Sequence, residues 1–338
     1  MRKRKRIAIS RILVAAAVFA AALILLLAYS DRGWNEKYSR PEKREEGNTA
    51  FMEEGLVTWN GDSYRKKPAM TLILVAGIDK ETEEQGYART RYRSGGQADF
   101  LLLLAVDHGE KKIHQLQIDR DTMAQITILG VYGNETGTRE LQICLAHSFG
   151  SRPDDNAKYT VRAVKNLLGG EIEIDGYYIM DYSAVPVFTD ALDGVPVTIP
   201  EDMTGVNPEW FEGHTITLRG QDAETFVRTR KTVGQGTNAE RMNRQGIYMR
   251  SAINRIHQNL ARDENFASAL LATMRRIVTT NLSEQRLLEE INAARSYEVL
   301  SIDTLPGEYV LADNGFMEFY PEEGAAESWV MTHLYTLR

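Results

Sequence analysis

The sequence predicts an α/β fold, with a mixed central β-sheet covered by helices on both faces and an N-terminal transmembrane helix before it. Residues 70–79 and 99–107 are short apolar runs, which are typical of strands whose two faces are both covered by helices. After Arg241, apolar residues recur at spacings of three and four, as they do on one face of a long helix. Residues 12–28 form an uncharged apolar run near the N-terminus.

The N-terminus has the charge pattern of a membrane anchor. Residues 1–11 carry a cluster of arginines and lysines, and the apolar run that follows would span roughly 25 Å as a helix. A basic flank before an apolar segment keeps the N-terminus in the cytoplasm. We therefore expect a cytoplasmic basic tip at 1–11 and a transmembrane signal-anchor at 12–29. The protein would then be a single-pass protein of the cell membrane, in contact with the lipid bilayer, and its C-terminal domain would be extracytoplasmic.

A cleaved signal peptide is the alternative interpretation of this segment. Ala28-Tyr29-Ser30 loosely resembles a cleavage site with small residues at its first and third positions. The apolar run is longer than the hydrophobic region of most signal peptides, which favours the anchor.

Composition and charge exclude several classes of protein. Of the 338 residues, 43% are hydrophobic and 26% are charged, so the chain can bury a sizeable core. The formal net charge is −7 in spite of the basic tip, which argues against a nucleic-acid partner. The single cysteine, Cys144, cannot form an intramolecular disulfide, and the histidines show no metal-ligand spacing. The fold must therefore be stabilised by its hydrophobic core.

The remaining elements follow in order along the chain. Residues 30–68 are mostly polar and predict an extracytoplasmic stalk, and residues 69–262 predict the α/β domain. Within that domain we expect strands at 112–118, 177–180 and 195–199, helices at 160–168 and 184–192, and a helix of about five turns from Arg241. Residues 263–338 predict a helical extension packed on the same domain, with two helices, a short strand at 309–312 and a terminal amphipathic helix.

Arginines gather at three places where this pattern is interrupted. Arg120 lies between Asp119 and Asp121 after a strand, and Arg228 and Arg230 share one face of an extended segment. At the start of the long helix, Arg244 and Gln245 each lie one turn from Arg241, after a glycine-rich entry. Each group alone fits a solvated turn or an ordinary helix surface. Together, in an acidic chain, they indicate a site that holds phosphate or pyrophosphate.

Two carboxylates could complete such a site. Asp79 ends the first apolar strand, and Asp99 begins the second. Each alone fits a strand-end cap, but strand ends on one sheet edge could bring them together. A few hard oxygen ligands, supplemented by substrate phosphate, are what Mg²⁺ uses. Asp79 and Asp99 are therefore the candidate metal ligands, with Mg²⁺ as the expected cofactor.

The order of the motifs resembles the LytR-CpsA-Psr family of bacterial cell-envelope enzymes, of which the chain would be a divergent member. The resemblance runs from about residue 70 to 254. It includes Gly-Ile-Asp79, Ala98-Asp99, Asp119-Arg-Asp-Thr122, Ala146-His-Ser-Phe-Gly150, Asp190-Ala-Leu-Asp-Gly-Val195, Leu218-Arg-Gly-Gln-Asp-Ala223, Val227-Arg-Thr-Arg230 and Arg241-Met-Asn-Arg-Gln245.

The resemblance implies an Mg²⁺-dependent phosphotransferase of the cell envelope. Such an enzyme moves a glycopolymer of the teichoic acid or capsule type from an undecaprenyl-pyrophosphate carrier to peptidoglycan and releases polyprenyl phosphate. Asp79 and Asp99 match the family's metal carboxylates. Arg120, Asp121 and Arg241 are the expected catalytic residues. The expected pyrophosphate-binding residues are Arg120, Arg228, Arg230, Asn238, Arg241, Arg244 and Gln245. The lipid tail would need a long apolar slot between the sheet and its helices.

Three positions depart from the family pattern. Gln97 and Gln142 stand where arginine and lysine are usual, and Asn238 stands where an aspartate is common. Because an amide cannot act as a general base, Asp121 or Asp99 would have to activate the acceptor hydroxyl. These departures leave open a second function, a protein that binds a lipid-linked glycan without transferring it. A transcriptional regulator is disfavoured, because the residues before the apolar run are too few for a DNA-binding domain.

Overall fold

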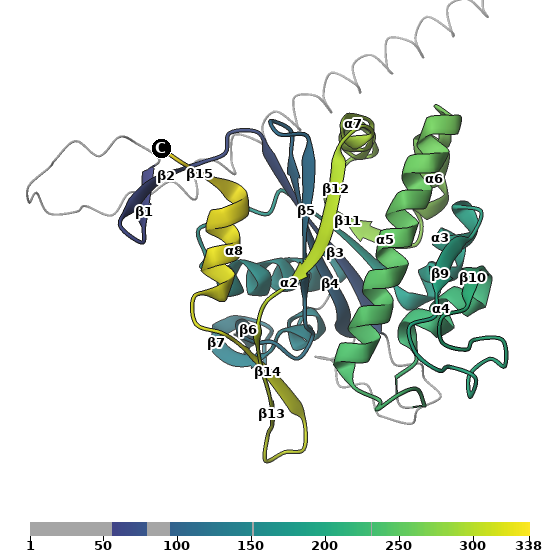
Figure 1. Ribbon diagram of the computed structural model, residues 1–338. Coiled ribbons are helices and arrows are strands. Elements are labelled where there is room, and N and C mark those ends of the chain that lie inside the picture. The colour runs from purple at the N-terminus through teal and green to yellow at the C-terminus, as the bar shows by residue number, and fades with distance from the viewer. Residues whose placement is uncertain (1–55, 80–94, 151, 231) are drawn as a thin grey trace, which may run out of the picture. The chain divides into compact units, whose positions relative to one another are not determined.

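The computed structural model describes residues 56–79, 95–150, 152–230 and 232–338 (Figure 1). The predicted cytoplasmic tip, the predicted transmembrane helix and most of the predicted stalk lie outside the described residues. Within the described ranges, no helix has both the length and the apolar character needed to cross a membrane.

The core of the fold is a mixed six-stranded sheet in the order β11-β8-β3-β4-β5-β12. Its strands are β3 (Met70–Asp79), β4 (Gln97–Asp107), β5 (Lys112–Ile118), β8 (Gly176–Asp181), β11 (Val278–Thr280) and β12 (Glu298–Thr304). β4 is antiparallel to both β3 and β5, whereas β8 is parallel to β3 and β12 is parallel to β5. The predicted mixed α/β fold is thus confirmed.

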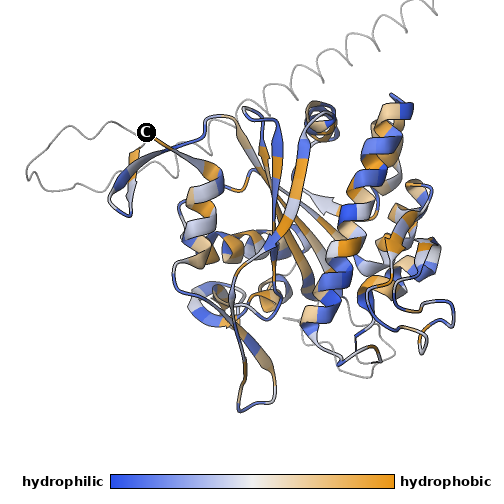
Figure 2. Cartoon of the chain, in the orientation of Figure 1, coloured by the Kyte–Doolittle hydropathy of each residue, from blue (hydrophilic) through white to orange (hydrophobic). Residues whose placement is uncertain are grey.

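Helices cover both faces of this sheet, as Figure 1 shows for α2 and α5. On one face, η2 (Ile143–Ser148), α2 (Pro153–Leu167) and α8 (Ala325–Leu334) pack against side chains of β3, β4 and β5. On the other face, β8 packs against α3 (Val185–Ala191), α4 (Gly220–Arg228), α5 (Asn238–Arg262) and α6 (Phe266–Met274). Figure 2 shows apolar residues along the central strands and many polar residues on α5, which agrees with two buried sheet faces.

Several predicted elements have different ends from those expected. α2 begins at Pro153, several residues before the predicted start, because proline suits the first turn of a helix and Asp154 and Asp155 follow it. α5 begins at Asn238 because Thr237 and Glu240 form a capping box ahead of the apolar periodicity. The hairpin of β6 (Met123–Leu129) and β7 (Glu135–Gln142) was not predicted. β10 (Thr215–Leu218), which pairs with β9 (Val195–Thr198), was not predicted either.

The C-terminal residues differ from the expected helical extension. They do contain α6, α7 (Glu284–Ala294) and α8, but β11 and β12 belong to the central sheet. The hairpin of β13 (Gly307–Leu311) and β14 (Met317–Pro321) follows, and β15 (Tyr335–Leu337) pairs with β2 (Asp62–Lys66), which also pairs with β1 (Leu56–Trp59). β12 was missed because it is a half-exposed edge strand whose pairing shifts register between Val299 and Ile302, which removes the period-two signal.

We expect Trp329→Ala to lower the free energy of unfolding by about 3–5 kcal/mol, because a buried aromatic side chain is lost from the core. Trp329 is 7% exposed, packs in the cluster on the α2 face of the sheet, and donates a hydrogen bond from Nε1 to Asp303 at 3.0 Å. Tyr132→Ala, at a side chain that is 96% exposed, should change the same quantity by about 0.5 kcal/mol or less. Urea denaturation of the wild type and the two variants measures both changes in the free energy of unfolding. Equal, small effects would show that the C-terminal segment is not part of the core.

Candidate functional site

A cavity of about 880 Å³, lined mostly by charged and polar residues, lies where β3 ends and β4 begins. We call it the arginine cavity. Most of the predicted site residues line it, namely Asp79, Asp99, Arg120, Asp121, Arg228, Arg230, Asn238 and Arg241. The structure therefore brings together residues from both strand ends, the β5 end, the loop after α4 and the start of α5.

Asp99 is the central anion of the arginine cavity. Its carboxylate is 3% exposed and accepts hydrogen bonds from Arg120 and, at 2.8 Å, from Arg241. Arg120 also donates to the Gln97 side chain at 2.5 Å. A buried carboxylate with two guanidinium partners is stabilised as the anion, and in turn it fixes both arginines in position.

Asp79 reaches the same cavity from the neighbouring strand. Arg228 Nη2 donates to Asp79 Oδ1 at 2.6 Å, and the Arg228 guanidinium also pairs with Glu224 at 3.1 Å. Burial raises the pKa of Asp79. The Arg228 charge opposes this shift, and the charge of Asp99 adds to it. The two predicted metal ligands thus face one cavity and interact electrostatically, as expected of strand ends on one sheet edge.

The residues present suit a magnesium ion held partly by its substrate. Asp79 and Asp99 offer hard carboxylate oxygens, but no group of three or more Asp, Glu, His or Cys side chains that could hold a metal occurs in the described ranges. Mg²⁺ commonly takes one or two protein carboxylates and completes its shell with phosphate oxygens and water. Both carboxylates also pair with arginines, so a metal ion here would share its ligands with the cationic side chains.

Arg230 contributes a further cation to the arginine cavity. Its guanidinium makes no hydrogen bond or ion pair with any residue in the described part of the chain. Burial lowers the pKa of Arg230, and the charges of Arg241 and Arg120 lower it further. An anion in the cavity would relieve this repulsion between arginines.

Asp121 is the titratable group best placed to act as a base near neutral pH. Burial raises the pKa of Asp121 to about 6; Arg120 opposes the shift and Asp119 adds to it. Gln142 Nε2 donates to the Asp121 carboxylate at 3.2 Å. Asp99, the other candidate base, has both carboxylate oxygens engaged by arginines, so Asp121 is the better of the two.

Asn238 joins the anionic and cationic parts of the site. Its Nδ2 donates to Asp119 at 2.8 Å, and its Oδ1 accepts from Arg241 at 2.6 Å. An amide can donate and accept at once, whereas an ionised aspartate could only accept and would repel Asp119. An asparagine at position 238, where the family resemblance leads one to expect an aspartate, therefore suits the two side chains that it contacts.

Arg244 and Gln245 lie outside the arginine cavity. Arg244 is 1% exposed; it pairs with Glu201 and donates to the carbonyl oxygens of Phe226 and Thr229. These carbonyls lie on either side of Arg228 in the chain, so Arg244 holds the backbone that carries Arg228. Arg244 thus positions Arg228 and is not among the described residues that line the arginine cavity, whereas the sequence predicted that it binds pyrophosphate.

Gln245 belongs to a second, apolar cavity of about 270 Å³, which we call the apolar slot. The slot lies between the sheet and helices α5, α6 and α7, and Ile73, Phe100, Met249 and Ile291 are among its lining residues. Gln245 donates to the Tyr182 hydroxyl at 2.9 Å.

The apolar slot and the arginine cavity are neighbours. Phe100 lines the slot and Asp99 the cavity, and the same holds for Val227 and Arg228. The Arg228 guanidinium lies 5.9 Å from the ring of Tyr182, which lines the slot. A molecule with an anionic head and an apolar tail could therefore place its head in the arginine cavity and its tail in the apolar slot.

Sequence reasoning missed the part of the site that the β13–β14 hairpin supplies. Tyr309, Phe316 and Met317 line the arginine cavity, and the Tyr309 hydroxyl donates to Asp119 across a separation of 190 residues. The predicted strand at 309–312 marked the segment, but no local pattern could place it beside Asp119. The β5–β12 pairing and the backbone N–H of Phe319, which donates to the Asp121 carbonyl oxygen at 2.8 Å, bring this hairpin to the site.

Comparisons with known proteins find relatives in sequence and in fold. A model of a protein family described as the LytR_cpsA_psr family matches residues 32–332. The chain is 27% identical over 258 residues to the polyisoprenyl-teichoic acid–peptidoglycan teichoic acid transferase TagU of Halalkalibacterium halodurans, covering 75% of each chain. Bacillus subtilis TagV has a similar structure, with a TM-score of 0.59 at 25% identity, covering 80% of this chain and 98% of that one. The structure of TagT bound to LIIa-WTA gives a TM-score of 0.59 at 21% identity and covers 79% and 92%, so that likeness concerns the fold alone.

We expect Arg244→Ala to lower the free energy of unfolding by about 3–5 kcal/mol, because it leaves the partly buried Glu201 carboxylate and two carbonyl oxygens without their partner. Arg230→Ala should leave stability unchanged or raise it, since it removes a cation repelled by its neighbours. Urea denaturation at neutral pH compares the two variants. A stable Arg244→Ala protein that binds pyrophosphate weakly would instead support direct contact between Arg244 and the ligand.

Proposed function

Because this chain belongs to the LytR-CpsA-Psr family, we propose that it is a phosphotransferase that attaches a glycopolymer of the teichoic acid or capsule type to peptidoglycan. The donor would be a polyprenyl-pyrophosphate-linked glycopolymer, and polyprenyl phosphate would be released. The observation that carries the proposal is the arrangement of Arg120, Arg228, Arg230 and Arg241 around one cavity, directly beside an apolar slot. The transferase function given in the name of the TagU relative supports the same reaction class.

The arginine cavity suits a pyrophosphate group. A pyrophosphate carries several negative charges, and planar guanidinium groups match its oxygens with paired hydrogen bonds. Arg230 has no partner in the described ranges that it would have to release, and buried Arg241 keeps a free Nε–H there, although Asp99 engages its Nη1. The apolar slot would hold the start of the polyprenyl chain, since its lining is almost wholly apolar.

The transfer step needs one new bond and one broken bond at phosphorus. The oxygen of a peptidoglycan hydroxyl would attack the phosphorus that carries the glycopolymer. The bond from this phosphorus to the bridging oxygen would break, and polyprenyl phosphate would leave with that oxygen. The hydroxyl proton would pass to the Asp121 carboxylate, while Arg120 and Arg241 stabilise charge on the phosphate oxygens. Fixed guanidinium groups need little reorganisation during the reaction, because Asp99 already holds two of them.

Asp79 and Asp99 would hold the magnesium ion when it is bound. The ion would supply further neutralisation of pyrophosphate charge. Because the pKa of Asp79 is raised, this carboxylate becomes a better ligand as the pH increases through that pKa.

The proposed location is the extracytoplasmic face of the cell membrane. Residues 12–29 would form the single-pass anchor, with the basic tip at 1–11 in the cytoplasm. A lipid-linked donor is confined to the bilayer, so an anchored enzyme would meet it there. The proposed partners are the lipid-linked glycopolymer, the peptidoglycan acceptor and the bilayer itself.

The transferase proposal predicts release of polyprenyl phosphate by the full-length protein in detergent. The substrates are a short-chain polyprenyl-pyrophosphoryl saccharide and peptidoglycan oligomers. We expect Mg²⁺-dependent release together with a sugar-phosphate adduct on the glycan. Arg120→Ala and Asp99→Ala should each reduce the rate by about 10²–10³-fold, as loss of preorganised charge does elsewhere. Arg262→Ala, at an exposed arginine at the end of α5, is the matched control and should retain the wild-type rate. Tight binding of the donor without release over hours would favour a protein that only binds lipid-linked glycans.

The proposed role of Asp121 also predicts how the transfer rate depends on pH. The base form of Asp121 is the carboxylate, so the transfer rate should increase as the pH rises through about 6 and then level off. Asp121→Asn should lower the rate by about 10²–10⁴-fold and remove this acid-side limb. The measurement is kcat/KM from pH 4.5 to 8, with folding at each pH checked by circular dichroism. An unchanged limb in Asp121→Asn would assign the base elsewhere.

A further inference from the structure

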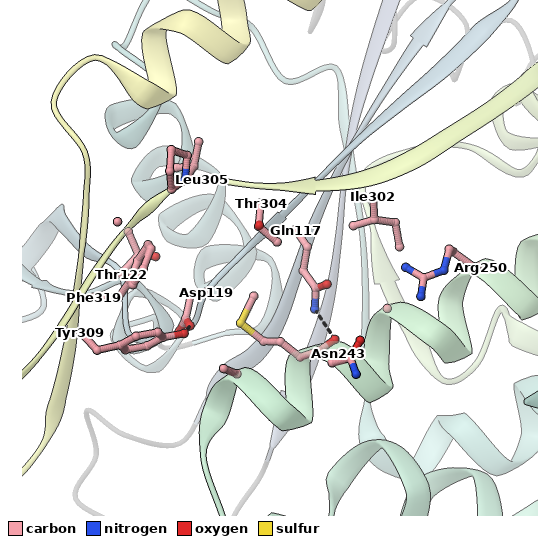
Figure 3. A pocket seen from close by; sticks show the side chains of 15 residues that line it. Gln117, Asp119, Thr122, Asn243, Arg250, Ile302, Thr304, Leu305, Tyr309 and Phe319 are labelled. Carbon is pink, nitrogen blue, oxygen red and sulfur yellow. Dashed lines mark hydrogen bonds between the residues drawn. The ribbon is translucent and has the colours of Figure 1, made fainter. Parts of the chain in front are cut away.

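A third space, a cleft of about 440 Å³, adjoins the arginine cavity (Figure 3). We call it the β12 cleft, because Ile302, Thr304 and the residues just after them form one wall. The first turns of α5 form the opposite wall. Tyr309 and Ala239 line both the β12 cleft and the arginine cavity, so the two spaces meet at these residues.

The boundary between the two spaces is held by hydrogen bonds. Asp119 lines the β12 cleft, accepts from the Tyr309 hydroxyl, and accepts from Asn238 Nδ2 at 2.8 Å. Asp121, two residues further along the chain, lines the arginine cavity. A group that crosses the boundary near Tyr309 would therefore pass from Asp119 toward the proposed base.

The lining of the β12 cleft suits an uncharged ligand with hydroxyl and amide groups. Gln117, Asn243 and Thr304 offer neutral donors and acceptors, as their positions in Figure 3 show. Among the described residues that line the cleft, Arg250 is the one arginine, in contrast to the group of arginines in the neighbouring cavity. Both oxygens of Asp119 already accept hydrogen bonds, so this carboxylate would add little repulsion toward a neutral group.

Aromatic and unpaired polar groups in the same cleft point to a ligand. The rings of Tyr309 and Phe319, which both line it, lie 4.9 Å apart. The Tyr309 ring is 42% exposed, and aromatic ring faces pack against the C–H faces of sugars. Thr122 is 0% exposed and also lines the cleft, yet its Oγ1 has no hydrogen-bond partner within the described part of the chain. A buried hydroxyl without a partner costs free energy unless a ligand or water satisfies it.

We propose that the β12 cleft binds the acceptor glycan, an uncharged chain of N-acetylated amino sugars, and directs one of its hydroxyls past Tyr309 toward the arginine cavity. This inference rests on the proposed transferase function and adds the site at which the acceptor binds. The cleft volume lies within the range of pockets that hold small ligands, so it accommodates a short segment of the chain while the remainder extends into solvent. Donor and acceptor then occupy separate spaces that meet at Tyr309.

The test uses two asparagines on α5 that receive the same substitution. Asn243 lines the β12 cleft, and Asn254 lies on the same helix outside it. Both side chains are exposed and make no side-chain hydrogen bond within the described ranges, so Asn243→Trp and Asn254→Trp should both fold. An indole at 243 would fill the cleft, and an indole at 254 would leave it open.

The binding measurement is calorimetry of the full-length protein in detergent, with a tetrasaccharide of N-acetylglucosamine as the probe, because this chain has the N-acetylated sugar backbone and carries no carboxylate. We expect Asn243→Trp to weaken tetrasaccharide binding by about tenfold or more, which corresponds to about 1.4 kcal/mol, while Asn254→Trp stays near wild type. Both variants should bind a short polyprenyl pyrophosphate as the wild type does, because neither substitution touches the arginine cavity.

The outcomes separate this proposal from the proposed function. Wild-type tetrasaccharide affinity in Asn243→Trp, or no saturable tetrasaccharide binding by the wild-type protein, would overturn the acceptor site even if transfer is observed. Asn243-dependent tetrasaccharide binding without transfer to any acceptor would retain the saccharide site and reject the transferase. In the transfer assay, Asn243→Trp should raise KM for the glycan and leave donor binding unchanged.

Discussion

The site depends on the buried carboxylate of Asp99, which lies between the guanidinium groups of Arg120 and Arg241. A carboxylate that is 3% exposed would be costly to bury alone, and two arginines turned toward each other would repel. Each charge is stable at the end of the sheet only because the others are present. This arrangement holds two cations in place before any phosphate enters, which is the condition for electrostatic catalysis without large reorganisation.

Other polar contacts extend this network outward in two directions. Asn238 hydrogen-bonds both Arg241 and Asp119. Asp119 in turn accepts a hydrogen bond from the hydroxyl of Tyr309 on the C-terminal hairpin. In the other direction, Arg244 holds the carbonyl oxygens around Arg228 and so positions that cation beside Asp79. The three departures from the family pattern fit this network: the amides of Gln97, Gln142 and Asn238 all hydrogen-bond to its charged groups. The neutral amides replace charge with directed hydrogen bonds in a cavity that many charged side chains already line.

Sequence reasoning located most of the residues of this site and the strands that carry them. Asp79 and Asp99 could be placed together because apolar runs mark β3 and β4, and both residues stand where those runs meet polar sequence. The direction of a single helical side chain was harder to predict. Arg241 and Arg244 are one turn apart on α5, yet Arg241 lines the cavity and Arg244 turns away toward Glu201. Spacing indicates that two residues lie near each other, but the partners available on neighbouring elements determine where each long side chain goes.

The sequence by itself determined the α/β class, the buried strands, the long helix and the cationic character of the site, because these follow from local periodicity and residue type. Only the tertiary structure decided that β11 and β12 complete the central sheet and that the β13–β14 hairpin forms part of the site. The physical reason is the distance along the chain: the contact between Tyr309 and Asp119 joins residues 190 positions apart. Such a contact depends on how the sheet closes around its edge strand, and no local pattern encodes it.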